Sequence, residues 1–266
     1  MRSMDLQGGF TVDTRPVGVF DSGVGGISTL GALIRELPEE SFLYYGDTAN
    51  APYGTKEPGE VLRCVRAVVD RLLAMDVKAL VIACNTATSV AAAALRAELA
   101  LPIVAMEPAL KPAHTMRHGG TVLVLATPVT LRLAKFQRLM ELYGEGAEPV
   151  PCPGLMELVE REAWTEAEAY LRELLARYRD TQLDAVVLGC THYSFLKPVL
   201  RGLLPAQTAV LDGNAGTARQ LRRVLTERGL LAPEGSVREV GLLSSSPDPA
   251  QPALMRHLLE TAGSLT

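Results

Sequence analysis

The sequence predicts an α/β protein of two similar domains, each a mainly parallel sheet flanked by helices, with the active site in the cleft between them. Short runs rich in Val, Ile and Leu alternate with longer amphipathic stretches along the 266 residues, which is typical of successive βαβ units. Two of the short runs also match without gaps: residues 77–84 read VKALVIAC and residues 183–190 read LDAVVLGC. The match indicates two similar halves, each contributing one cysteine.

Strands are expected where short β-forming runs stand between turn residues. They cover residues 17–20, 42–45, 79–83, 103–106, 122–126, 185–188, 209–211 and 240–243. Helices are expected over residues 27–37, 58–74, 87–99, 130–143, 166–178, 215–228 and 252–261. Right-handed crossover connections would place these helices on both faces of each sheet.

No Gly/Ser-rich linker marks a domain boundary, so the division follows from the expected strand order. Residues 14–109 and 216–266 are expected to form the first domain, and residues 110–215 the second. Residues 1–13, ahead of the first strand, are expected to be a disordered tail.

The composition is that of an ordinary globular protein, with 48% apolar and 21% charged residues. A net charge of −4 and an aromatic content of 5% give no reason to expect a nucleic-acid partner. The N-terminus lacks the long apolar core of a secretory signal, and no apolar run is long enough to span a bilayer. We therefore expect a cytoplasmic protein with no membrane partner.

Cys84 and Cys190 are the strongest candidates for chemistry. Each follows an expected strand, and open parallel sheets bind ligands at the carboxyl ends of their strands. Cysteine is also one of the most often buried residues, so Cys64 is interpreted as core and Cys152 as structural. Without a CxxC pair, we expect free thiols and no metal site. Two thiols facing each other across one pocket would suit an acid and a base, and thus stereoinversion at carbon.

Polar residues follow both thiols at the expected start of the next helix. They are Asn85 and Thr86 after the first cysteine, and Thr191 and His192 after the second. A thiol at a helix N-terminus interacts favourably as thiolate with free amides. A neighbouring imidazole can share proton transfer with a thiol. A lone histidine is more often structural, and that alternative stays open for His192.

Two loops after early strands complete the candidate site. The first, residues 20–26, reads FDSGVGG. Its GxGG spacing differs from a dinucleotide fingerprint, and a carboxylate at the strand tip would repel a pyrophosphate. Asp21 suits an ammonium group or the orientation of a base, and Ser22 a carboxylate; both could instead cap a helix. The second loop, residues 46–55, contains Tyr53 and Gly54, whose hydroxyl and amide groups could bind substrate oxygens.

Four motifs, in this order and spacing, resemble those of the glutamate racemases in the cofactor-independent aspartate/glutamate racemase superfamily. They are DSGVGG at 21–26, PYG at 52–54, CNT at 84–86 and CTH at 190–192. The resemblance runs from about residue 17 to residue 212. Three positions depart from the usual pattern: Thr88 stands where serine is expected, Ala126 where glycine is common, and Gly213 where serine is common.

The resemblance implies conversion of L-glutamate to D-glutamate for peptidoglycan, without a cofactor or a metal. Cys84 and Cys190 would be the paired proton donor and acceptor, helped by Asp21 and His192, with Glu160 as a further acidic residue. Substrate would be bound by the following residues: Asp21, Ser22, Tyr53, Gly54, Asn85, Thr86, Thr191 and His192.

Other functions remain open on the same residues. A racemase of aspartate or of hydantoins would use the same scaffold. A thiol hydrolase would use one cysteine as nucleophile with His192 as base, and a binding protein would use only the pocket. A homodimer is expected for a two-domain enzyme with exposed helices.

Overall fold

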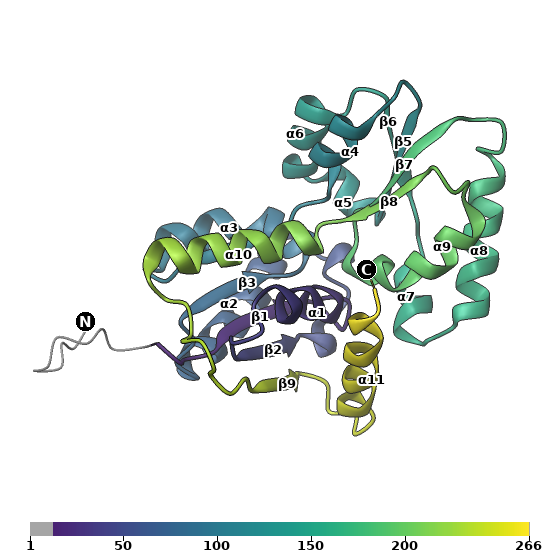
Figure 1. Cartoon of the computed structure of the whole chain (residues 1–266). Helices are drawn as coiled ribbons and strands as arrows, with labels where there is room; N and C mark the ends of the chain where they lie inside the picture. Colours follow the sequence, from purple (N-terminus) through teal and green to yellow (C-terminus); the bar gives the residue numbers. More distant parts are fainter. Residues whose placement is uncertain (1–12, 266) are drawn as a thin grey trace, which may run out of the picture.

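Two parallel sheets, each with helices on both faces, stand next to each other in the computed structural model (Figure 1). The structure describes residues 13–265, so the expected disordered tail lies outside the described residues except for Asp13. The first sheet has the strand order β4-β3-β1-β2-β9 and the second β6-β5-β7-β8. All neighbouring strands in both sheets run parallel. The predicted fold class is confirmed.

The first sheet is formed by both ends of the chain. Its strands are β1 (Val17–Asp21), β2 (Phe42–Gly46), β3 (Ala79–Ile82), β4 (Ile103–Ala105) and β9 (Val240–Ser244). One face is covered by α1 (Ile27–Glu36), α10 (Asn214–Arg228) and α11 (Gln251–Gly263). The other face packs on α2 (Pro58–Ala74) and α3 (Asn85–Glu98). Burial on both faces explains why β1 and β3 are continuous apolar runs rather than alternating ones.

The second sheet lies in the middle of the chain. Its strands are β5 (Thr121–Ala126), β6 (Ala147–Pro151), β7 (Leu183–Leu188) and β8 (Ala209–Asp212). One face packs on α4 (Leu110–Met116) and α6 (Ala134–Tyr143). The other face is covered by α7 (Leu155–Glu160), α8 (Trp164–Ala176) and α9 (Lys197–Leu203). Short helical segments complete the chain: η1 (Thr48–Asn50), η2 (Tyr53–Thr55), α5 (Pro128–Arg132) and η3 (Thr191–Leu196).

The strand β6 was not among the predicted strands. Its sequence AEPVP carries Pro149 and Pro151, and proline cannot donate to a hydrogen-bond ladder. The sheet order places β6 at an edge, where proline is tolerated. The predicted helix over residues 130–143 is also two helices, α5 and α6, which meet at Leu133 in an extended conformation.

The chain passes between the sheets after β4 and again after β8. Every strand of the first sheet falls within residues 14–109 or 216–266, and every strand of the second within 110–215. Within residues 13–265, no helix is both long and apolar enough to cross a membrane.

Candidate active site

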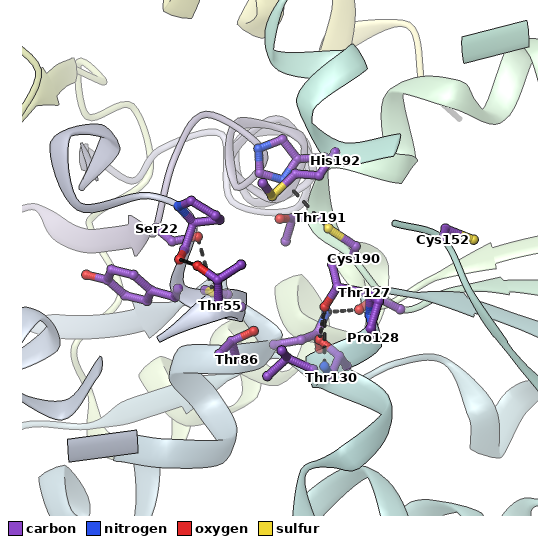
Figure 2. A pocket seen from close by; sticks show the side chains of 18 of the residues that line it. Ser22, Thr55, Thr86, Thr127, Pro128, Thr130, Cys152, Cys190, Thr191 and His192 are labelled. Atoms are coloured by element: carbon purple, nitrogen blue, oxygen red, sulfur yellow. Dashed lines mark hydrogen bonds between the residues drawn. The ribbon is translucent and has the colours of Figure 1, made fainter. Parts of the chain in front are cut away.

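A cavity of about 430 Å³ lies where the carboxyl ends of the two sheets face each other. It is lined by both cysteines that sequence analysis singles out, Cys84 following β3 and Cys190 following β7. All the residues that the sequence predicts to bind substrate line it as well: Asp21, Ser22, Tyr53, Gly54, Asn85, Thr86, Thr191 and His192. Figure 2 shows part of this lining, with Ser22 and Thr86 on the side opposite Cys190.

Cys84 ends the first of the two matching strands and caps α3. Its Sγ accepts a hydrogen bond from the backbone N–H of Ala87 at 3.5 Å and donates one to Ser22 Oγ at 3.6 Å. Burial, together with the negative charge of Asp21, raises the pKa of Cys84 despite these hydrogen bonds. Cys84 is therefore a neutral thiol, able to donate a proton.

Asp21 is fully buried at the end of β1 and connects the two halves of the site. Its Oδ1 accepts hydrogen bonds from the backbone N–H of Ser22 at 2.6 Å and from Ser22 Oγ at 3.1 Å. Its Oδ2 accepts one from Thr191 Oγ1 at 2.9 Å. Because Thr191 directly follows Cys190, this carboxylate lies near one thiol and is tied to the segment that carries the other.

Cys190 has a basic partner that Cys84 lacks. Its Sγ lies 3.7 Å from His192 Nδ1, and His192 Nε2 lies 3.0 Å from Glu160 Oε1; Figure 2 shows the sulfur pointing toward the ring. Burial opposes a charge on the imidazole, but its hydrogen bonds to Cys190 and Glu160 raise the pKa of His192 well above its ordinary value. Burial likewise opposes a charge on Glu160, but the bond to His192 lowers its pKa.

The histidine is thus held as an imidazolium between a carboxylate and a thiol. A cation beside a sulfur favours its thiolate form. The two halves of the site therefore differ: a thiol with a raised pKa lies on the Cys84 side, and an imidazolium lies beside the sulfur on the Cys190 side.

The glycines of residues 23–26 make room for this arrangement. A Cβ on Gly25 would lie 2.4 Å from His192 Nδ1, and one on Gly23 would lie 2.5 Å from Glu160 Oε1. The absence of side chains at these positions allows the close approach of His192 and Glu160 to this loop.

The side-chain amide of Asn85 has a hydrogen-bond partner for its nitrogen but none for its oxygen. Its Nδ2 donates to the carbonyl oxygen of Gly189 at 3.0 Å, across the two sheets. Its Oδ1 is buried with no hydrogen-bond partner among the described residues. A buried acceptor without a donor is costly, so this oxygen is suited to receive an N–H from a ligand.

Several lining residues come from segments that sequence analysis did not assign to the site. They are Thr127, Thr130, Arg132, Cys152, Met156 and Glu157. Thr127 caps α5 by accepting the N–H of Thr130, and the two hydroxyl oxygens lie 2.9 Å apart (Figure 2). The position of Thr127 in the sequence could have predicted this placement. Thr127 directly follows β5, and the carboxyl end of β5 faces the same cleft as that of β7.

Cys152 lines the cavity but is not equipped for proton transfer. Its Sγ donates to the carbonyl oxygen of Val150, and Figure 2 shows the sulfur pointing away from Cys190. Burial raises the pKa of Cys152 to about 12. We expect Cys152→Ala to lower the turnover rate less than about threefold, since removing this buried S–H group changes the packing and not the two proton-transferring thiols. Steady-state kinetics beside the wild-type chain measures this, and a loss comparable to that of Cys190→Ala would contradict it.

Comparisons with known proteins identify the family of the chain. The sequence pattern of the Asp/Glu/hydantoin racemase family matches residues 24–221. Glutamate racemase from Clostridium botulinum is 43% identical over 242 residues, covering 90% of this chain and 94% of that one. Glutamate racemase from Bifidobacterium adolescentis is 45% identical, covering 93% and 98%.

A solved structure shows the same fold. Glutamate racemase from Thermus thermophilus, solved in complex with beta-chloro-D-alanine, is 37% identical with a TM-score of 0.76, and the similarity covers 96% of each chain. The family match spans most of the chain and includes the strand ends that carry both cysteines. The chain described here belongs to the Asp/Glu/hydantoin racemase family.

Proposed function

We propose that the chain racemises glutamate by proton transfer between two thiols, without a cofactor. The observation that carries this proposal is the presence of Cys84 and Cys190 in one cavity, each at the carboxyl end of a different sheet. Its relatives at 43% and 45% identity are glutamate racemases, which favours glutamate as the substrate. Such a reaction would supply D-glutamate for peptidoglycan.

In the proposed reaction one cysteine acts as base and the other as acid. A thiolate removes the α-proton from one face of the substrate, and the opposite thiol delivers a proton to the other face. The roles are exchanged in the reverse direction. The His192 imidazolium lies beside Cys190, whereas Cys84 has no cationic partner and a raised pKa. We therefore assign the first base to Cys190 and the first acid to Cys84.

The α-carbon is a weak acid, so its developing negative charge needs stabilisation. Preorganised hydrogen-bond donors are the usual means in a water-poor site. The lining offers the hydroxyl of Thr86 and the backbone amides that begin α3 and η3. The unpartnered Oδ1 of Asn85 would accept a hydrogen bond from the substrate ammonium group.

A thiol hydrolase is the second candidate, because Cys190, His192 and Glu160 form a nucleophile–base–acid series. Cys84 would have no catalytic role in such a reaction. This candidate predicts a covalent acyl-enzyme at Cys190 and full activity in Cys84→Ala.

Chiral chromatography of amino acids incubated with the chain tests the proposal. Without added cofactor, L-glutamate and D-glutamate should each approach the same equimolar mixture, and aspartate should change at least about tenfold more slowly, since its side chain is one methylene shorter. Faster inversion of aspartate or of a hydantoin would overturn the substrate assignment. Hydrolysis of an ester or amide without inversion would favour the thiol hydrolase.

A further inference from the structure

A buried carboxylate outside the proton-transfer pairs lies behind one wall of the cavity. Asp47 follows β2 and is only 2% exposed. Among the described residues, no lysine or arginine forms an ion pair with it. A buried charge of this kind is tolerated only when hydrogen bonds satisfy it.

Two neighbours supply these hydrogen bonds, and both come from the loop that follows β2. The hydroxyl of Tyr53 donates to Asp47 Oδ2 at 2.6 Å. The side-chain N–H groups of Asn50 donate to both carboxylate oxygens, at 3.0 and 3.1 Å. The carboxylate therefore fixes the conformation of the loop through its hydrogen bonds to Asn50 and Tyr53.

The contact changes the role that sequence analysis gave to Tyr53. Its hydroxyl hydrogen points to Asp47, so it is not available as a donor to a substrate oxygen. Burial and the hydrogen bond to Asp47 raise the pKa of Tyr53, so the phenol stays neutral. Tyr53 is 1% exposed, and its contribution is to hold the backbone of its own segment.

This segment forms a wall of the cavity. Pro52, Tyr53, Gly54 and Thr55 all line it, and Figure 2 shows Thr55 near Ser22. The wall also reaches the second sheet's side of the cleft, because a Cβ on Gly54 would lie 3.6 Å from Thr127 Oγ1. At its other end, the backbone N–H of Asp47 donates to the carbonyl oxygen of Asp21 at 2.9 Å.

We propose that Asp47 is a positioning residue, which holds the Pro52–Thr55 wall against the substrate through its hydrogen bond with Tyr53. The inference rests on the proposed function, since it concerns the binding of glutamate in this cavity. Asp47 touches neither thiol and supplies no proton. Its loss should therefore weaken substrate binding more than it slows proton transfer.

Asp47→Asn tests the inference, because it keeps the shape and removes the charge. An amide offers one acceptor oxygen in place of two, so it cannot serve Tyr53 and both N–H groups of Asn50. A hydrogen bond to a charged group contributes about 1.5–3 kcal/mol, which corresponds to roughly a 10- to 100-fold change in an equilibrium constant. We expect KM for L-glutamate to rise by about tenfold or more, with kcat changed less than about threefold.

A double-variant comparison shows whether Asp47 acts through Tyr53. Tyr53→Phe should raise KM to a similar extent, and Asp47→Asn combined with Tyr53→Phe should be no worse than the more affected single variant, because coupled residues are not additive. Asp70→Asn is the matched control: Asp70 is an exposed carboxylate on α2, and its loss changes the net charge equally. The control should leave KM unchanged.

The outcomes are separable. An active wild-type chain with an unchanged KM in Asp47→Asn overturns the inference and leaves the proposed function standing. The inference is also overturned if the increases in KM of the two single variants multiply in the double variant. If Asp47→Asn fails to fold, as judged by circular dichroism, Tyr53→Phe carries the test, and an unchanged KM in that folded variant overturns the inference. A wild-type chain that does not invert glutamate overturns the proposed function and the inference with it.

Discussion

Replacement of either Cys84 or Cys190 by serine is expected to lower the rate of glutamate racemisation by at least roughly 10³-fold, in both directions. Serine keeps the shape of cysteine, but its hydroxyl is a far weaker acid and does not form a base near neutral pH. Because the two residues serve as acid and base in turn, each direction needs both. Chiral chromatography of the products measures the loss.

The matched control for these variants is Cys64→Ser, on α2 and outside the lining of the cavity. It should keep the wild-type rate. Full activity in Cys84→Ser together with inactivity in Cys190→Ser would contradict the two-thiol account and point to the thiol hydrolase.

Replacement of Glu160 by glutamine is expected to move the alkaline limb of the pH–rate profile to lower pH. The pKa of Glu160 is below and that of His192 above its ordinary value, so both are charged throughout the neutral range. Removing the carboxylate lowers the pKa of His192, and the cation beside Cys190 is then lost at a lower pH. The rate therefore begins to fall at a lower pH than in the wild-type chain, and acidification restores the cation and the rate.

A shift of one pH unit corresponds to about a tenfold loss of kcat/KM on the alkaline limb. Glu157→Gln is the matched control, since Glu157 lies on the same helix and lines the cavity without contacting His192. Its profile should keep the wild-type midpoint. A uniform loss at all pH values in Glu160→Gln would contradict the electrostatic role and indicate a structural one.

The fold class and the central residues of the site were predictable from sequence because they depend on local patterns. Strands buried on both faces read as apolar runs, and a cysteine that ends such a run must lie at the carboxyl edge of a sheet. The two matching runs therefore placed both thiols at sheet edges. That the edges face each other depends on how the chain crosses between the sheets, and the family resemblance supplied that expectation.

The parts that were missed depend on tertiary context. Strand β6 is short and proline-rich, and only its edge position makes it a strand. Thr127 and Thr130 belong to the site because α5 begins at the same edge as η3. The sequence predicts polar residues in the loop after β2, but not that Tyr53 donates to a buried Asp47. All three features depend on how short segments pack in the folded chain, and none of these segments has a hydrophobic periodicity that predicts its place.

The most direct test of the two-thiol account is proton NMR of L-glutamate and, separately, of D-glutamate with the wild-type chain in D2O and no added cofactor. We predict that the α-proton signal is lost from both enantiomers, and that at early times the inverted product carries deuterium while the remaining substrate keeps its proton. This is because one thiol removes the proton and the other, exchanged with solvent, delivers a deuteron. An inverted product that retains its α-proton, or no loss of signal from either enantiomer, would contradict the account.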